Sequence, residues 1–158
     1  MQHQDRTSML RLIHGGRWAA LAACGRNGPI AAQVAYATEP GLASILLLLS
    51  LLAAHTRALL ENPRAALSIG EPDDGRHDPQ TLRRLTLTGR VVVVDRDDGH
   101  CGTAAKRYLN RFPAARQLFE FSDFMLLRLF IAEARYVGGL GVARTLSADT
   151  LQALENEE

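Results

Sequence analysis

Cysteine is scarce in this sequence of 158 residues. The two cysteines, Cys24 and Cys101, are too few for a disulfide framework and lie outside the clusters of three or four ligands that a zinc site needs. The five histidines show no paired metal-binding spacing either. We therefore expect two reduced thiols and no structural metal.

Long apolar segments and an excess of one charge are also absent. The leucine-rich run of residues 44–50 is too short to span a membrane, and residues 1–11 are polar and lack the apolar core of a signal peptide. Eighteen basic and seventeen acidic residues leave a formal charge of +1, which gives no field to attract a nucleic acid or an anionic membrane. We expect a cytoplasmic protein with neither partner.

Motifs of hydrolases and dinucleotide-binding proteins are missing as well. No Gly-x-Ser-x-Gly nucleophile elbow occurs, and the glycines at 138, 139 and 141 lack the spacing of the dinucleotide fingerprint. Any redox chemistry would therefore have to come from a bound cofactor.

The composition that remains, with 47% hydrophobic residues, is typical of one globular domain spanning residues 1–158. Its middle predicts a strand, a helix and a second strand. The first strand, Ser44–Ser50, is almost entirely apolar, which is typical of a strand buried on both faces. The helix carries an apolar stripe of Leu52, Leu59 and Leu60 and ends at Asn62-Pro63, because proline cannot continue a helix.

The rest of the chain predicts a mainly β protein with flanking helices. Strands are expected at residues 18–24, 30–38, 64–69 and 85–95, and residues 124–132 and 135–137 form a final strand or strand pair. Helices are expected from a cap at Asp5 or Thr7 to Gly15-Gly16, and at residues 103–110, 114–121 and 148–155. Gly89 marks a bulge in the fourth of these strands. We expect about six strands in a mostly antiparallel sheet, with three meandering strands before the central helix.

The polar residues around the first strand end suggest an anion site. His55, Thr56 and Arg57 follow Ser50 closely, and together they offer hydroxyl, imidazole and guanidinium donors for a phosphate group. The alternatives are a solvated helix face for the triplet and a local backbone hydrogen bond for Ser50.

The same residues resemble a known family signature. Residues 50–57 read SLLAAHTR and residues 62–67 read NPRAAL, which is similar to the S-x-L-A-x-H-T-x-N and N-P-R-x-S-L motifs of split-barrel flavoproteins. Further pieces match in order: Gly28-Pro29, Asp78-Pro79, residues 84–89, Asp123-Phe124 and residues 136–141. Over residues 10–143 the chain resembles the pyridoxamine 5′-phosphate oxidase-like family, near its haem-utilisation (HugZ-like) branch.

That resemblance implies a fold and a function. It implies an FMN-binding split β-barrel, α+β with most of the chain in strands, acting as a flavin-dependent oxidoreductase on an unidentified small molecule. Ser50, His55, Thr56 and Arg57 would bind the cofactor. The alternative is a protein of the haem-utilisation type that binds haem or another anionic ligand without flavin chemistry. Related split barrels pair, so we also expect a homodimer with its site at the subunit interface.

Two further candidates for the cofactor site lie elsewhere in the sequence. Tyr36 would stack on the flavin ring, although a tyrosine in a strand more often packs within the protein. Arg84 opens the long strand and is a candidate through the resemblance alone, since such an arginine is more often a surface charge.

Three positions depart from the family pattern. Ala32, Leu51 and Ala58 stand where the family has serine, arginine and asparagine. If those positions contact the cofactor in relatives, each change removes a hydrogen bond of about 0.5–1.5 kcal/mol. We therefore expect weaker cofactor binding than in the family.

Overall fold

The computed structural model describes residues 3–95 and 99–156, and the side chains from residue 102 onward in the second range. The helices are α1 (His3–Gly15), α2 (Ala54–Glu61), α3 (Gly99–Arg111) and α4 (Ala148–Asn156), with short 3-10 segments η1 (Pro40–Leu42), η2 (Pro79–Thr81) and η3 (Pro113–Glu120). The strands are β1 (Trp18–Gly25), β2 (Gly28–Ala35), β3 (Ala37–Thr38), β4 (Ser44–Ser50), β5 (Arg64–Gly70), β6 (Arg84–Val93), β7 (Phe124–Gly139) and β8 (Val142–Ser147).

The sheet closes on itself through a bend at Tyr36. Its order is β2-β1-β5-β6-β7-β4-β3, and every neighbouring pair is antiparallel. The strands at the two ends of this order, β2 and β3, are separated in the sequence only by Tyr36. One continuous segment therefore pairs with β1 before the bend and with β4 after it, which joins the two edges of the sheet into a barrel.

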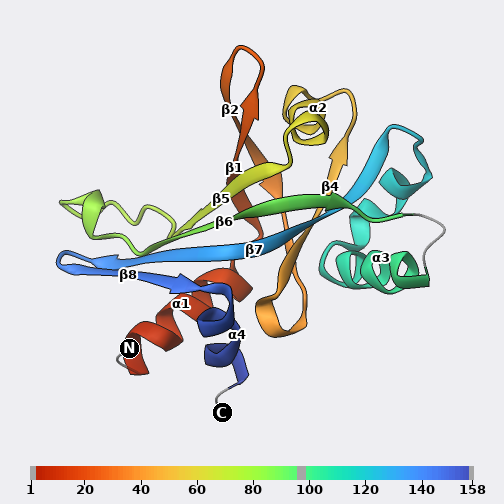
Figure 1. Cartoon of the computed structure of the whole chain (residues 1–158). Helices are drawn as coiled ribbons and strands as arrows, with labels where there is room; N and C mark the ends of the chain where they lie inside the picture. The colour runs from red at the N-terminus through yellow and green to blue at the C-terminus, as the bar shows by residue number, and fades with distance from the viewer. Residues whose placement is uncertain (1–2, 96–98, 157–158) are drawn as a thin grey trace.

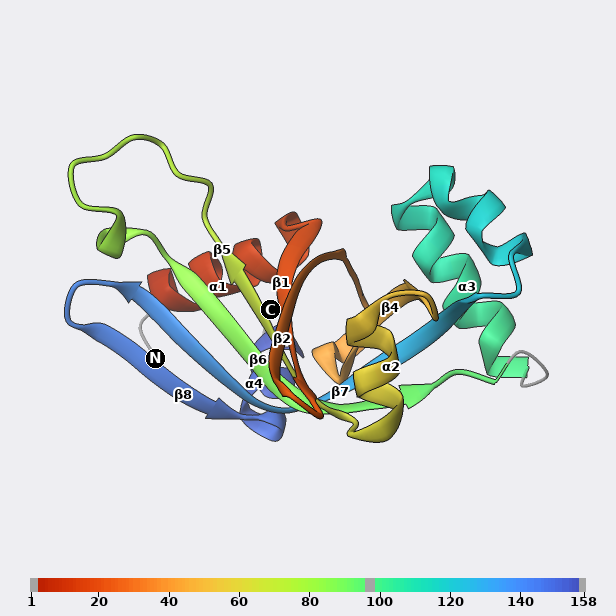
Figure 2. The same cartoon turned by 90° about the horizontal axis from the view of Figure 1, so that it is seen from above.

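The long strand β7 pairs with different strands along its length (Figure 1). Its first part pairs with β4 and its second part with β8, while β6 lies along its other side. This arrangement confirms the predicted split barrel with flanking helices. Figure 2 shows α1 and α4 grouped at one end and α3 at the other.

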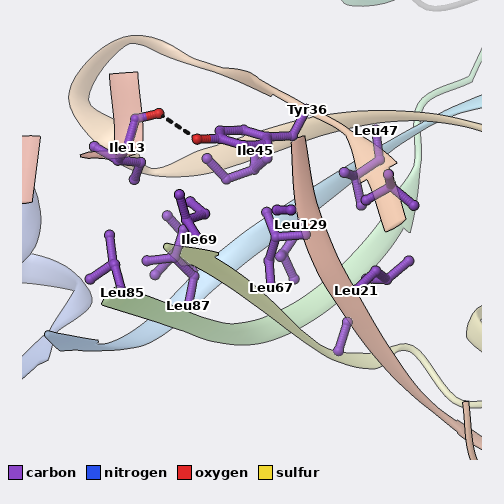
Figure 3. Close-up of a cluster of buried hydrophobic side chains, with 14 of the residues drawn as sticks. Ile13, Leu21, Tyr36, Ile45, Leu47, Leu67, Ile69, Leu85, Leu87 and Leu129 are labelled. Atoms are coloured by element: carbon purple, nitrogen blue, oxygen red, sulfur yellow. Dashed lines mark hydrogen bonds between the residues drawn. The ribbon is translucent and has the colours of Figure 1, made fainter. Parts of the chain in front are cut away.

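The interior of the barrel is filled by alternate residues of its strands (Figure 3). Ile45 and Leu47 of β4 face Leu67 of β5 and Leu129 of β7 there, and all four are fully buried. The helices α1, α2 and α4 close the interior with Met9, Ile13, Leu59 and Leu151. This packing confirms that side chains on one face of β4 are buried in the core.

The other face of β4 is covered by α3 and η3. Leu46 and Leu48 pack there against Tyr108 of α3 and Ala115 of η3 in a second apolar cluster. Ionic contacts at the edge of this layer tie α3 to the sheet: the buried Glu39 accepts hydrogen bonds from Arg128, from Arg107 (3.2 Å) and from Ser44 (2.5 Å). Both faces of β4 are thus buried, as its apolar sequence predicts.

Several sequence-based expectations need correction. The sheet has eight strands, not about six, because the segment predicted as 30–38 breaks at Tyr36 and because β8 was not foreseen. The predicted meander is confirmed, since the segment 30–38 pairs with β1 through β2 and with β4 through β3. The helix predicted at residues 114–121 is the 3-10 segment η3.

The predicted apolar stripe of α2 is wrong in two of its three residues. Leu52 is 76% exposed and precedes the helix, and Leu60 is 46% exposed. The buried side of α2 instead presents Thr56, Ala58 and Leu59. Leu52 lies before the helix, which begins at Ala54, and Leu60 lies about 100° around the helix from the buried Leu59.

The predicted bulge at Gly89 is confirmed. The pairing of β6 with β7 shifts register between Thr88 and Gly89. A Cβ atom at Gly89 would overlap the carbonyl oxygen of Phe130, so only glycine allows the two backbones to approach this closely.

The expectations about the cysteines and about membrane-spanning segments can be compared with the described part of the chain. Cys24 is a free, exposed cysteine, while the side chain of Cys101 lies outside the described residues. No helix among the described residues is both long enough and apolar enough to cross a membrane.

Candidate functional site

The candidate site lies where β4 ends and α2 begins. Ser50 closes the turn between them: its hydroxyl donates to Asp123 Oδ2 (2.7 Å) and accepts from the amide of Leu52 (3.1 Å). The amide of Leu51 donates to the carbonyl of Asp123 (2.7 Å). Ser50 and Asp123 therefore fix the path of the chain into α2.

Arg57 lies one turn into α2 and folds back over this turn. Its Nη1 donates to the carbonyl oxygens of Leu52 (2.8 Å) and Leu51 (3.2 Å). The residue is exposed, and no carboxylate among the described residues lies within ion-pair distance of its guanidinium. The positive charge at the start of α2 is therefore available to an anion.

Thr56 and His55 differ in their surroundings. Thr56 is fully buried, and its hydroxyl has no hydrogen-bond partner among the described residues. A buried hydroxyl without a partner is costly, and this one lies on the buried side of α2. His55 is half-buried, and burial lowers its pKa below the ordinary value of 6.5, which leaves the imidazole neutral at pH 7.

The N-terminus of α2 is open to an anion. Its N-cap residue is Ala53, which makes no side-chain capping bond. The first amides of a helix have no carbonyl acceptor within the helix, and the helix dipole places partial positive charge at this end. Together with Arg57 these amides form a positive environment that suits a phosphate or carboxylate group.

Ser50, His55, Thr56 and Arg57 thus all lie at the β4–α2 junction, with Arg57 exposed, His55 half-buried and Thr56 on the buried side of α2. The structure places the other two candidates elsewhere. Tyr36 is buried in the core, where its hydroxyl donates to the carbonyl of Ile13 (2.9 Å; Figure 3), which favours the packing alternative. Arg84 opens β6, and its guanidinium donates to the carbonyls of Gln80 (3.0 Å) and Leu82 (3.2 Å).

The three departures from the family pattern also occupy different surroundings. Ala58 is buried on the inner side of α2, while Ala32 and Leu51 are half-buried in β2 and in the turn after β4. Leu51 alone belongs to the turn that holds the site. An asparagine at 58 would need a partner within the core, so alanine there is consistent with packing.

Asp123 was not foreseen as part of the site. It lies 73 residues after Ser50 in the sequence, and it reaches the turn because β7 pairs with β4 at Phe124 opposite Ser50. The Asp123-Phe124 pair was matched only as a family motif, and nothing local in the sequence joins it to Ser50.

Comparison with known proteins identifies a matching family and a similar plant protein. Residues 4–152 match the family described as CREG, beta-barrel. The chain is 37% identical over 101 residues to the Non-canonical heme oxygenase HOZ, chloroplastic, of Arabidopsis thaliana, a match that covers 63% of this chain and 29% of that protein.

Solved structures share the fold over nearly the whole chain. The heme binding protein from Mycobacterium smegmatis superposes with a TM-score of 0.84 and 26% identity, over 97% of this chain and 62% of that one. A protein of the pyridoxinephosphate oxidase family from Clostridium acetobutylicum, related to general stress protein 26, superposes with a TM-score of 0.70 and 15% identity, over 96% and 99% of the two chains. The chain spans less than two thirds of both the plant and the mycobacterial proteins.

Proposed function

The chain belongs to the CREG beta-barrel family, and from this premise we propose that it is an FMN-binding split-barrel protein that acts as a flavin-dependent oxidoreductase on a small molecule. The observation that carries the proposal is the guanidinium of Arg57, which has no carboxylate partner among the described residues and lies over the uncapped N-terminus of α2. A phosphate suits such a positive helix end.

The donors on this turn suit the phosphate of FMN. Arg57 brings a guanidinium that already lies over the turn, and the first amides of α2 have no acceptor within the helix. The neutral imidazole of His55 adds a further donor. Ser50 positions the turn and is not itself a free donor, because its hydroxyl is hydrogen-bonded to Asp123 and holds the turn in place.

The residues present therefore fit the anionic end of the cofactor. FMN, when bound, supplies the electron transfer that the side chains themselves do not provide. The chain would bind the phosphate through Arg57 and the helix amides, and the apolar residue at Leu51 would remove one polar contact relative to the family pattern.

A second candidate function is haem binding. Two relatives above 25% identity carry haem in their names, the plant haem oxygenase and the mycobacterial haem-binding protein. The carboxylates of haem are anions that the same turn would accept, and a neutral imidazole such as that of His55 is the form that ligates iron. Arg57 would then bind a carboxylate and not a phosphate.

The test is a titration of the purified protein with FMN and, separately, with haemin, followed by visible absorbance. We expect FMN to bind and Arg57→Gln to weaken it about tenfold or more, because a charge-assisted hydrogen bond contributes roughly 1.5–3 kcal/mol. Arg26→Gln is the matched control. It removes an equal charge from an arginine that pairs with Glu61, the last residue of α2 (2.8 Å).

The outcomes separate the two functions. Unchanged absorbance and melting temperature at about 100 μM FMN would refute the flavin proposal. A haemin spectrum that shifts in the wild type and changes in His55→Ala would then establish the second candidate.

A further inference from the structure

A cavity lies at the end of the barrel opposite the β4–α2 site. It has a volume of about 480 Å³ and is formed by the end of α1, the start of β1 and the end of β5. Since β5 begins next to α2 and ends at the cavity, its seven residues separate the two sites by about 20 Å. Figure 2 shows α1 and α2 at the two ends of β5.

The charges around this cavity favour an anion. Three arginines line it, Arg11, Arg17 and Arg83, against the single carboxylate of Glu71. Glu71 is already bound to Arg83, whose Nη1 and amide both donate to it at 2.8 Å. Among the described residues no carboxylate lies within ion-pair distance of Arg11 or Arg17. The guanidinium of Arg17 lies over the ring of Phe112, 5.3 Å from its centroid, so both arginines lack an anionic partner.

The remaining walls favour a flat apolar group. Trp18 stands at the cavity with 61% of its surface exposed, and Leu12 and Pro72 supply further apolar surface. Gly15 and Gly70 leave room, because a Cβ atom at either position would meet no atom within 4 Å. An exposed tryptophan beside unpaired arginines provides a ring for stacking and a charge for pairing.

We propose that this cavity binds a small organic anion that joins a flat ring to a carboxylate, with Trp18 contacting the ring and Arg11 and Arg17 binding the carboxylate. A volume of about 480 Å³ lies within the usual range for small-molecule sites. The site uses no residue of the β4–α2 turn, so it is independent of the proposed cofactor.

The single tryptophan makes the test specific to this cavity, since Trp18 is the only one in the sequence. Trp18 fluorescence is followed while the protein is titrated with 3-phenylpropionate and with 3-phenylpropanol, which has a similar size but no charge. We expect a saturable change for the acid, with a dissociation constant of about 1 mM, and none for the alcohol.

Variants locate the binding. Arg11→Gln combined with Arg17→Gln should weaken the acid about tenfold or more, and Gly70→Val should abolish binding by filling the cavity. Two controls should bind like the wild type: Arg116→Gln, which removes an exposed charge from η3, and Arg57→Gln, which alters only the cofactor turn.

Several results would overturn the proposal. They are equal binding of the acid and the alcohol, binding that survives Gly70→Val, and no saturable change up to about 20 mM acid. It would also fail if Trp18 were shielded from acrylamide quenching at micromolar protein concentration and became accessible on dilution. A second copy of the chain would then occupy the cavity.

Discussion

At the scale of single residues, Thr56 and Ser50 lie six positions apart and differ in hydrogen bonding. The hydroxyl of Thr56 is fully buried and has no hydrogen-bond partner among the described residues, which is costly. The neighbouring Ser50 is the opposite case, because its hydroxyl both donates and accepts within the turn. The two hydroxyls therefore differ in both burial and hydrogen bonding, which the sequence does not show.

We predict that Thr56→Val stabilises the ligand-free protein by about 1 kcal/mol, because it replaces an unpaired buried hydroxyl with a methyl group of similar size. The same change should leave FMN and haemin binding close to that of the wild type, because the hydroxyl lies on the buried side of α2. Urea denaturation measures the first effect and absorbance titration the second.

Ser50→Ala is the comparison. It should destabilise the protein by about 1 kcal/mol, because it leaves Asp123 and the amide of Leu52 without a partner. A loss of stability in Thr56→Val would show that the hydroxyl has a partner in the folded protein and would contradict this prediction.

At the scale of elements, the barrel depends on places where a strand changes partner or direction. The segment from β2 to β3 bends at Tyr36, and β6 shifts register against β7 at Gly89. Both positions curve the sheet so that it closes around the apolar core. The bulge is the better place for a test, because its glycine contacts the backbone of the neighbouring strand.

We predict that Gly89→Ala destabilises the protein by about 2 kcal/mol or more, because its methyl group would collide with the carbonyl oxygen of Phe130. Gly70→Ala is the matched control, since it makes the same substitution in a strand where the added methyl meets open space. Urea denaturation of the two variants should give clearly different midpoints, and equal midpoints would contradict the close approach seen at the bulge.

At the scale of the whole molecule, the outer face of the barrel carries a row of small residues. Ala22 of β1 lies opposite Ala31 of β2 on one side and Ala66 of β5 on the other, and Ala66 lies opposite Thr88 of β6. All four are exposed or half-buried. Small side chains across four strands let a second sheet approach closely, which supports the expected homodimer.

We predict a dimeric mass by light scattering at micromolar concentration and a monomeric mass for Ala22→Arg, because a long charged side chain would separate the two faces. Ala114→Arg places the same side chain on the exposed surface of η3 and should stay dimeric. A wild-type protein that is monomeric at this concentration would refute the prediction.

Much of this structure could be predicted from the sequence, because the signals involved are local. The apolar run of β4, the proline that ends α2, the bulge glycine and the family motifs each depend on residues close together in the chain. The match to the CREG beta-barrel family and the shared fold of a pyridoxinephosphate oxidase family protein confirm the resemblance that those motifs suggested.

The sequence by itself therefore determined the fold class and the turn on which the candidate site lies. Only the tertiary structure decided the pairing of β4 with β7, the approach of Asp123 to Ser50, and the burial of Tyr36 and Thr56. The same holds for the cavity beside Trp18, whose walls come from three separate segments of the chain. The physical reason is that hydrophobic pattern and turn chemistry act over a few residues, whereas strand partners and the rotation of a helix are set by packing across the whole barrel.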